Sequence, residues 1–266
     1  MPQNLVSLLL RPCSSDPEEA MTDARPIPAP ADLFDLTGKV AIVTGGSRGL
    51  GRAISEGLAR AGADVVIASR KLDACERAAE EITAATGRRT LPYACHVGHW
   101  DELDGLADAA YDAFGHVDVL VNNAGMSPLY DDVRDVTEEL WEKTVGLNLK
   151  GPYRLTALVG SRMFEGDGGS VVFVSSQAAF TPPTNSIPYG AAKAGLHSMT
   201  KGFASLWRRK VRVNTICSGA FRTDITKAWP AIPDGIGEPE EVVGAALYFA
   251  SDASSYSNGA ILDVAG

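Results

Sequence analysis

Tyr189 and Lys193 are four residues apart in a stretch whose apolar spacing predicts a helix, so their side chains should share one face. A free phenol has a pKa of about 10, which is too high for easy proton exchange at neutral pH. A nearby ammonium group favours the phenolate and lowers that pKa. Tyr189 could then donate a proton to a carbonyl oxygen or accept one from an alcohol. Taken alone, the pair also fits a half-buried tyrosine beside a surface lysine.

A second group of residues indicates a phosphate-binding turn. Residues 44–51 read Thr-Gly-Gly-Ser-Arg-Gly-Leu-Gly, and they follow a short β-rich run and lead into a helical pattern. Glycines let the backbone turn tightly and approach a pyrophosphate closely. The start of a helix offers free N–H groups and a positive dipole end to the anion. The position between a predicted strand and a predicted helix favours this interpretation over a merely tight turn.

Both groups need regular elements to position them, and the apolar periodicity predicts these elements from residue 38 onward. The predicted strands are residues 39–44, 65–68, 90–95, 117–121, 170–175, 211–216 and 260–264. The predicted helices are residues 50–61, 72–86, 100–114, 137–165 (as two helices), 189–208 and 239–250. Apolar strands that alternate with helices indicate one α/β domain, a doubly wound parallel sheet covered on both faces. Ligands of such sheets bind at the carboxyl ends of the strands.

Residues 1–36 differ from the rest of the chain. They combine many prolines with the acidic run Asp16-Pro17-Glu18-Glu19 and have no sustained periodicity. We expect residues 1–36 to be a disordered or poorly ordered tail and residues 37–266 to be the folded domain. Met21 offers an alternative start, so residues 1–20 need not belong to the protein. The apolar run at residues 5–10 is too short to span a bilayer.

The composition argues against several kinds of partner. A net charge of −9 provides no global positive field for nucleic acid or an anionic membrane surface. The scattered cysteines form no CxxC pair, which argues against a disulfide framework or a cysteine-rich zinc site; they are Cys13, Cys75, Cys95 and Cys217. His96 and His99 follow Cys95, but no fourth ligand is evident, so no metal is predicted. We expect a cytoplasmic protein with a small-molecule substrate and neither nucleic acid nor membrane as a partner.

The chain resembles the short-chain dehydrogenase/reductase family in four motifs that occur in order. The turn at residues 44–51 has the family's Thr-Gly-x-x-x-Gly-x-Gly spacing, and Asn122-Asn123-Ala124-Gly125 follows the fourth predicted strand. Residues 189–193 match Tyr-x-x-x-Lys, with Ser176 upstream at the usual position. Asn148 lies where the family has its catalytic asparagine. The resemblance begins at about Leu36 and implies a Rossmann fold and hydride transfer between NAD(P)(H) and a carbonyl or secondary alcohol.

The resemblance also implies the site residues. Asn148, Ser176, Tyr189 and Lys193 would be catalytic: Ser176 would bond the substrate oxygen, Lys193 would also bind the nicotinamide ribose, and Asn148 would help hold a water. The remaining cofactor contacts are expected from loops at the strand ends. These contacts are Gly45, Ser47, Arg48, Gly49, Leu50, Gly51, Ser69, Arg70, His96, Val97, Asn123, Ala124, Gly125, Gly219 and Thr223, together with Tyr189 and Lys193.

The end of the second predicted strand indicates the cofactor. Rossmann-type NAD enzymes place an acidic side chain there, which binds the ribose hydroxyls and would repel a 2′-phosphate. This chain has the neutral Ser69, followed by Arg70, which can form a charge-assisted contact with a phosphate. Arg48 should approach the same phosphate from the other side. We therefore predict NADP(H) as the preferred cofactor, with NAD(H) possible. The alternative is that Arg70 and Lys71 are merely solvated at a helix start.

Several departures from the family concern the cofactor and substrate loops. His96 stands where the family often has an acidic residue near the adenine, and Ser218-Gly219 replaces its Pro-Gly. The segment 226–238 is short and the sequence stops at Gly266, so we expect a weaker grip on the substrate. Candidate pocket residues are apolar: Met126, Pro128, Leu129, Phe180, Phe221 and Trp229.

Two alternative functions remain. A nucleotide-sensing binding protein without turnover would share the fold, but it need not keep all four predicted catalytic residues. A 3-oxoacyl-acyl-carrier-protein reductase would need a docking surface. The basic run Arg208-Arg209-Lys210 is better explained by the favourable placement of cations at a helix end. The resemblance further implies a homo-oligomer, a dimer or a tetramer, that pairs through the helices near residues 151–165 and 189–208.

Overall fold

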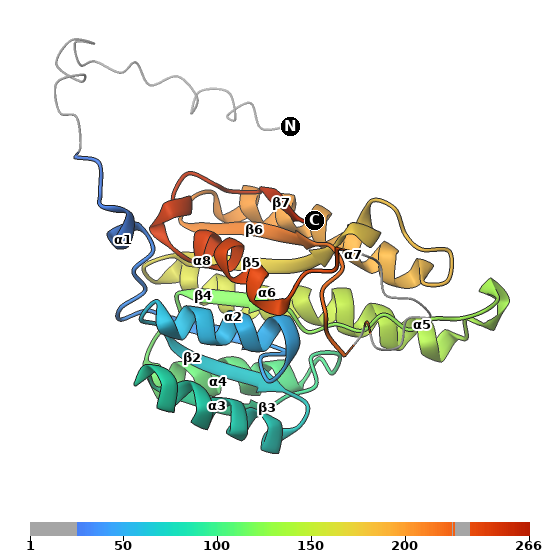
Figure 1. Ribbon diagram of the computed structural model, residues 1–266, viewed down its shortest axis with the longest axis horizontal. Coiled ribbons are helices and arrows are strands. Elements are labelled where there is room, and N and C mark those ends of the chain that lie inside the picture. Colours follow the sequence, from blue (N-terminus) through green and yellow to red (C-terminus); the bar gives the residue numbers. More distant parts are fainter. Residues whose placement is uncertain (1–25, 225, 227–234) are drawn as a thin grey trace, which may run out of the picture.

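The computed structural model describes residues 26–224, 226 and 235–266. Its centre is a seven-stranded parallel sheet with the order β3-β2-β1-β4-β5-β6-β7 (Figure 1). The strands are β1 Val40–Thr44, β2 Asp64–Ser69, β3 Thr90–Ala94, β4 Val119–Asn122, β5 Gly169–Ser176, β6 Val211–Ser218 and β7 Ile261–Val264. Each begins and ends within two residues of the predicted strand, and the predicted doubly wound α/β fold is confirmed.

Helices cover both faces of the sheet because successive strand residues point to opposite sides. Ala41 and Val43 join one core cluster, whereas Val40 and Ile42 join the other. The first cluster lies under α2 Gly49–Arg60, α3 Leu72–Thr86 and α8 Val243–Ala250. The second lies under α4 Glu102–Phe114, α6 Gly151–Glu165 and α7 Ile187–Trp207. The predicted helical region 137–165 contains α5 Glu138–Val145, the π-helical turn Gly146–Lys150 and α6.

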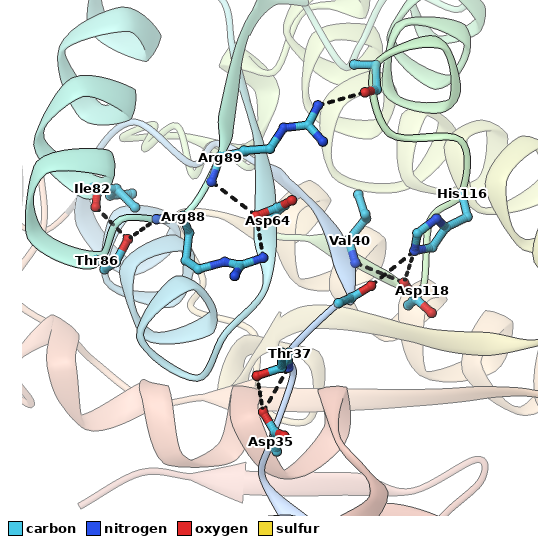
Figure 2. Close-up of polar contacts among 12 residues, drawn as sticks. Asp35, Thr37, Val40, Asp64, Ile82, Thr86, Arg88, Arg89, His116 and Asp118 are labelled. Carbon is cyan, nitrogen blue, oxygen red and sulfur yellow. Dashed lines mark hydrogen bonds and ion pairs between the residues drawn. The ribbon is translucent and has the colours of Figure 1, made fainter.

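The amino ends of the strands are joined by ion pairs and side-chain hydrogen bonds. Asp118, just before β4, accepts hydrogen bonds from the Val40 backbone N–H at 2.8 Å and from Lys39 Nζ at 3.1 Å. Figure 2 shows this edge, with the pairs Asp35–Thr37, Val40–Asp118, His116–Asp118, Asp64–Arg88 and Asp64–Arg89. These contacts tie β1, β2 and β4 to their incoming segments at the edge opposite the strand-end loops that carry the family motifs.

Part of the predicted tail belongs to the described chain. Residues Pro30–Leu33 form the short helix α1, and Leu36 is buried in the core with its N–H bonded to the Ala61 carbonyl at 2.8 Å. Residues 1–25 of that predicted tail lie outside the described residues. In Figure 1, α1 lies at one end of the molecule and α5 projects from the other. Among the described helices, none combines the length and the apolar character needed to cross a membrane.

Candidate active site

The turn after β1 has the backbone geometry of an anion site. Gly45 and Gly49 have φ angles of +65° and +53°, which side-chain-bearing residues rarely adopt. A Cβ on Gly51 would collide with the Gly45 carbonyl oxygen, so the first turn of α2 can approach the loop only with glycine there. Leu50 packs at the margin of the core. The predicted turn therefore ends at a helix N-terminus, whose first N–H groups can bind a phosphate group.

The segment after β4 supports that turn from the neighbouring strand. Thr44 Oγ1 accepts the backbone N–H groups of Asn123 and Ala124 at 3.0 and 3.1 Å. The Asn123 amide donates to the Thr44 carbonyl at 2.9 Å, and a Cβ on Gly45 would lie only 2.8 Å from the Asn123 amide nitrogen. The side chain of Asn123, a predicted cofactor contact, is thus bonded to the glycine turn itself.

Three of the predicted catalytic residues meet at the carboxyl end of β5. Ser176 is the last residue of that strand, and its side chain hydrogen-bonds Tyr189 in the first turn of α7. Lys193 follows one turn later, with Nζ 5.7 Å from the centroid of the Tyr189 ring. The same Nζ donates a hydrogen bond to the Val174 carbonyl at 2.8 Å, and Lys193 is only 4% exposed.

Asn148, the fourth predicted catalytic residue, lies in the π-helical turn between α5 and α6. Its Nδ2 donates to the carbonyls of Thr144 and Met126, each at 2.9 Å, and its Oδ1 accepts the Met126 N–H at 3.2 Å. A Cβ on Gly125 would lie 2.8 Å from Asn148 Oδ1 and 3.5 Å from Lys193 Nζ. The Asn148 amide and the Lys193 ammonium therefore both border the position that a side chain on Gly125 would occupy. Single π-helical turns of this kind are frequent at functional sites.

Burial dominates the electrostatics of this group. It raises the pKa of Tyr189, and the hydrogen bond from Ser176 opposes that rise while Cys217 adds to it. Burial also lowers the pKa of Lys193 to about 8, against a smaller opposing effect of Cys217. Our expectation that the lysine would bring the tyrosine pKa below its usual value is therefore wrong for this structure. Desolvation of the phenolate is the largest cause of the raised pKa.

The predicted 2′-phosphate contacts divide into two groups. Ser47 Oγ donates to Ser69 Oγ at 2.9 Å, and Arg70 beside them is exposed at the end of β2. Arg48 instead forms an ion pair with Asp224 at 2.7 Å, which joins the glycine turn to the segment after β6. The structure brings Ser47 and Ser69 together and ties the guanidinium of Arg48 to that segment.

The loop after β3 is organised around one carboxylate. Glu102 accepts the His96 backbone N–H and bonds His99 Nδ1, both at 2.6 Å. The two imidazoles stack with centroids 4.1 Å apart, and His96 Nδ1 accepts the Gly98 N–H at 3.1 Å. Burial lowers the pKa of His96, and the charges of His99 and Arg70 add to that effect, so His96 is neutral at neutral pH. Val97, the other predicted contact here, is buried.

The loop after β6 contains the last predicted cofactor contacts. The Gly219 N–H donates to the Val264 carbonyl at 2.9 Å, and the Thr223 methyl lies 3.3 Å from where a Cβ on Gly49 would be. Thr223 thus lies against the glycine turn. Phe221 is only 6% exposed and packs into the core, so its prediction as a pocket residue is wrong.

The other candidate pocket residues have different positions. Phe180 is 57% exposed, and Leu129 is also exposed, whereas Met126 and Pro128 are half-buried. Trp229 lies outside the described residues. These side chains follow β4 and β5, so they lie at the same edge of the sheet as Tyr189.

Cys217 borders the site, although the sequence analysis gave it no role. It lies at the end of β6, and its charge would affect both Tyr189 and Lys193. Burial raises the pKa of this thiol to about 12, and a hydrogen bond to Asp263 contributes in the same direction. The thiol is therefore protonated and unreactive at neutral pH. In the sequence, only its position near a strand end, two residues before Gly219, indicated that Cys217 would lie near the site.

Comparison with known proteins identifies the family. Residues 39–232 match the sequence profile of the family described as short chain dehydrogenase. The chain belongs to this family. Dehydrogenase/reductase SDR family member 4 of Oryctolagus cuniculus is 37% identical over 87% of this chain and 94% of its own length. D-threitol dehydrogenase of Mycolicibacterium smegmatis is 34% identical over 92% of this chain and 98% of its own length.

Solved structures agree with this assignment. The NADPH-dependent 3-quinuclidinone reductase of Rhodotorula rubra has a TM-score of 0.84 at 29% identity and covers 92% of this chain and 97% of its own. L-sorbose reductase of Gluconobacter frateurii, complexed with NADPH and L-sorbose, has a TM-score of 0.82 at 28% identity, with coverages of 88% and 97%. The predicted family and the prediction of a dehydrogenase/reductase acting on CH–OH groups are confirmed for this short-chain dehydrogenase.

Proposed function

We propose that this short-chain dehydrogenase transfers a hydride between NADP(H) and a carbonyl or secondary alcohol, with Tyr189 as the general acid in reduction and the general base in oxidation. One observation carries the proposal. Ser176 hydrogen-bonds Tyr189, Lys193 Nζ lies 5.7 Å from the centroid of the Tyr189 ring, and Lys193 and Asn148 both border Gly125. The glycine turn that Asn123 supports follows β1, and only β4 separates β1 from β5, so a cofactor held at that turn would reach this group.

The proton chemistry follows from the environments of these side chains. The raised pKa of Tyr189 keeps the phenol protonated at neutral pH, as an acid for carbonyl reduction requires. Ser176 would bond the substrate oxygen and hold it beside the phenol. When the proton leaves, the Lys193 ammonium stabilises the phenolate, and its pKa of about 8 lets it pass a proton on. The bound nicotinamide supplies the hydride itself.

Asn148 would extend this proton path. Its Oδ1 accepts one hydrogen bond, from the Met126 N–H, and a carbonyl oxygen has a second lone pair for a water. Its two Nδ2 hydrogens are both bonded to protein carbonyls, which fixes the direction of the amide. A water held at Oδ1 would lie near Lys193 Nζ, because both atoms border Gly125.

The preference for NADP(H) rests on the end of β2. Ser69 is neutral and Arg70 is exposed beside it, so no carboxylate at that position repels a 2′-phosphate. Two structural neighbours are consistent with this choice: the quinuclidinone reductase is NADPH-dependent, and the sorbose reductase was complexed with NADPH. A 7α-hydroxysteroid dehydrogenase with the same fold was complexed with NADH, so the fold alone does not decide the cofactor.

The docking surface required by the acyl-carrier-protein alternative receives no support. Arg208 is 19 residues after Tyr189, which places the basic run about 28 Å from Tyr189 along the axis of α7. Arg209 lies over the Tyr256 ring at 5.1 Å and Lys210 over the Phe164 ring at 5.4 Å. The cluster therefore belongs to the amino edge of the sheet and not to the mouth of the proposed site.

We also propose a homo-oligomer, a dimer or tetramer, formed through α6 and α7. Tyr153 on α6 and Leu206 on α7 are 47% and 65% exposed, so each of these helices presents a large apolar side chain that a second copy of the protein could cover. Light scattering at micromolar concentration measures the assembly, and a monomer would contradict this part of the proposal.

The function is tested with a panel of ketones, aldehydes and secondary alcohols, each followed by the absorbance of NADPH and, in parallel, of NADH. We expect turnover of at least one ketone with NADPH at a higher kcat/KM than with NADH. Binding of NADPH without turnover of any compound would favour the nucleotide-sensing alternative instead. Equal or better use of NADH would overturn the cofactor preference.

A further inference from the structure

The segment Met126–Tyr130 links two parts of the proposed catalytic site, and we call it the 126–130 strap. One end bonds Asn148, and the other bonds the start of α7, the helix that carries Tyr189. The strap begins directly after Gly125, which borders Asn148 Oδ1 and Lys193 Nζ. Both ends of the strap are held by hydrogen bonds to other elements of the site. Because its half-buried apolar residues lie between these two anchors, the anchors determine where this wall of the site lies.

The first anchor is the main chain of Met126. Its N–H donates to Asn148 Oδ1 at 3.2 Å, and its carbonyl accepts Asn148 Nδ2 at 2.9 Å. Two opposed hydrogen bonds to one buried amide leave this end of the strap little freedom to shift.

The second anchor is Tyr130, which contacts the N-terminus of α7. Its backbone N–H donates to the Asn185 carbonyl at 3.2 Å, and its hydroxyl accepts the Ile187 N–H at 2.9 Å. The first N–H groups of a helix have no partner within the helix. Within the described residues the Ser186 side chain makes no capping bond, so Tyr130, 57 positions earlier in the chain, supplies the cap.

This cap lies two residues before Tyr189. The strap thus runs from the amide that holds Met126 to the helical turn that carries the proposed acid–base residue. A change at the Tyr130 anchor would move the half-buried Met126 and Pro128 wall relative to the Ser176–Tyr189 pair. It would leave the proton donor itself in place, because α7 is also held by its packing on β5 and β6.

We propose that Tyr130 is a positioning residue that fixes the 126–130 strap against α7 and thereby sets the size of carbonyl substrate that reaches Tyr189. The proposal rests on the proposed function, since it concerns the substrate of that same site. It assigns Tyr130 no part in proton transfer and no contact with the cofactor.

The test is Tyr130→Phe, which keeps the ring and removes the hydroxyl acceptor. We expect KM for the best small ketone of the panel to rise about three- to tenfold, the range expected for one net hydrogen bond. We expect a smaller change in kcat, an unchanged Kd for NADPH, and a higher rate for a bulky ketone relative to a small one. Hydrogen exchange should become faster in peptides that cover residues 126–130 and 185–190.

Tyr256→Phe is the matched control, because Tyr256 is exposed at the opposite edge and its hydroxyl makes no hydrogen bond within the described residues. It should leave every one of these measurements unchanged. If the wild-type enzyme turns over a ketone and Tyr130→Phe has the same KM, the role of Tyr130 is refuted and the proposed function stands. Unchanged hydrogen exchange in the strap of the variant would refute that role as well. Absence of wild-type turnover on the whole panel would refute the proposed function and, with it, the substrate role of Tyr130.

Discussion

At the amino edge of the sheet Asp118 accepts hydrogen bonds from a backbone N–H and from Lys39, and it pairs with His116 at 3.2 Å. At the carboxyl edge, Lys193 is buried, bonds a backbone carbonyl, and forms no ion pair within the part of the chain that the structure describes. At the amino edge the Asp118 carboxylate is paired with cations, whereas at the carboxyl edge the buried Lys193 ammonium has no anionic partner among the described residues.

This difference separates stability from function within one sheet. An unpaired buried charge costs free energy, so it persists mainly where a shifted pKa serves chemistry. Paired groups such as Asp118 and Lys39 instead join neighbouring elements of the fold. Substitutions at the carboxyl edge should therefore change turnover more than stability, and those at the amino edge should do the reverse.

Replacement of Tyr189 by phenylalanine should give the largest effect. The ring and its packing remain while the transferable proton is lost, so kcat should fall by about 10²- to 10⁴-fold. The Kd for NADPH and the melting temperature should stay close to wild type. Steady-state kinetics and calorimetry measure these quantities, with Tyr256→Phe as the control. Undiminished turnover would remove Tyr189 from the mechanism.

Lys193 should make the stability depend on pH in a defined window. Its pKa is lowered from an ordinary 10.5 to about 8, so the unfolded chain binds more protons between these pH values. Its contribution to the free energy of unfolding therefore rises as pH increases from about 8 to 10.5. Below pH 8 the buried ammonium costs on the order of 3 kcal/mol.

The comparison of wild type with Lys193→Met isolates this effect. The variant should be relatively more stable at pH 7 than at pH 10, while its turnover is strongly reduced. Urea unfolding across pH 7–10 measures the difference between the two proteins. A difference that stays constant over this range would show that Lys193 does not titrate there.

Asp118→Ala should give the converse result at the amino edge. It leaves the Val40 N–H and Lys39 without their acceptor, which should lower the free energy of unfolding by about 1–3 kcal/mol. The kcat of the folded enzyme should not change. Urea unfolding and kinetics test both statements, with the exposed Asp112 as an Asp→Ala control on α4. A loss of kcat larger than the loss of stability would break the contrast between the edges.

Arg70→Ala should weaken NADPH binding roughly ten- to hundredfold and leave NADH binding little changed. The reason is the loss of a charged hydrogen bond to the 2′-phosphate, about 1.5–3 kcal/mol. Titration of each cofactor by fluorescence provides the two Kd values. Arg77→Ala is a suitable control, because Arg77 is exposed in the second turn of α3 and pairs with Asp73. Equal weakening of both cofactors would place Arg70 away from the phosphate.

Removal of residues 1–20 should have the smallest effect of all. Their composition cannot supply a packed face, and none of the predicted site residues lies among them. A protein that starts at Met21 should keep its melting temperature and its kcat. A clear fall in melting temperature would show that this segment contributes to the fold.

Patterns of neighbouring residues predicted most of the strands and helices, and they predicted which residues of one helix share a face. Buried parallel strands are apolar throughout, so their ends could be predicted to within two residues. The shared helix face of Tyr189 and Lys193 followed from their spacing alone. The positions of the glycine turn, the Asn122–Gly125 motif and Ser176 at strand ends followed from the alternation of strands and helices.

The features that the sequence could not predict depend on contacts between distant positions. The Arg48–Asp224 pair joins residues 176 positions apart, and no local pattern specifies such a pairing. The direction of the Tyr189 pKa depends on how much protein surrounds the phenol, which only the folded chain determines. Phe221 is a large apolar residue of the kind that lines a pocket, but its ring packs into the core. A side chain at Gly237 would lie only 2.9 Å from that ring, so the glycine leaves the space for it.

The position of α1 has a practical consequence for handling this enzyme. The described chain starts next to α1, at the end of the molecule away from α5 (Figure 1), and enters β1 at its amino end. The Ser176–Tyr189 pair lies at the carboxyl ends of the strands. An affinity tag or surface linker placed before Pro26 would therefore be attached at the amino edge of the sheet. An immobilised enzyme would then expose the carboxyl edge, where the Ser176–Tyr189 pair lies, to the solution.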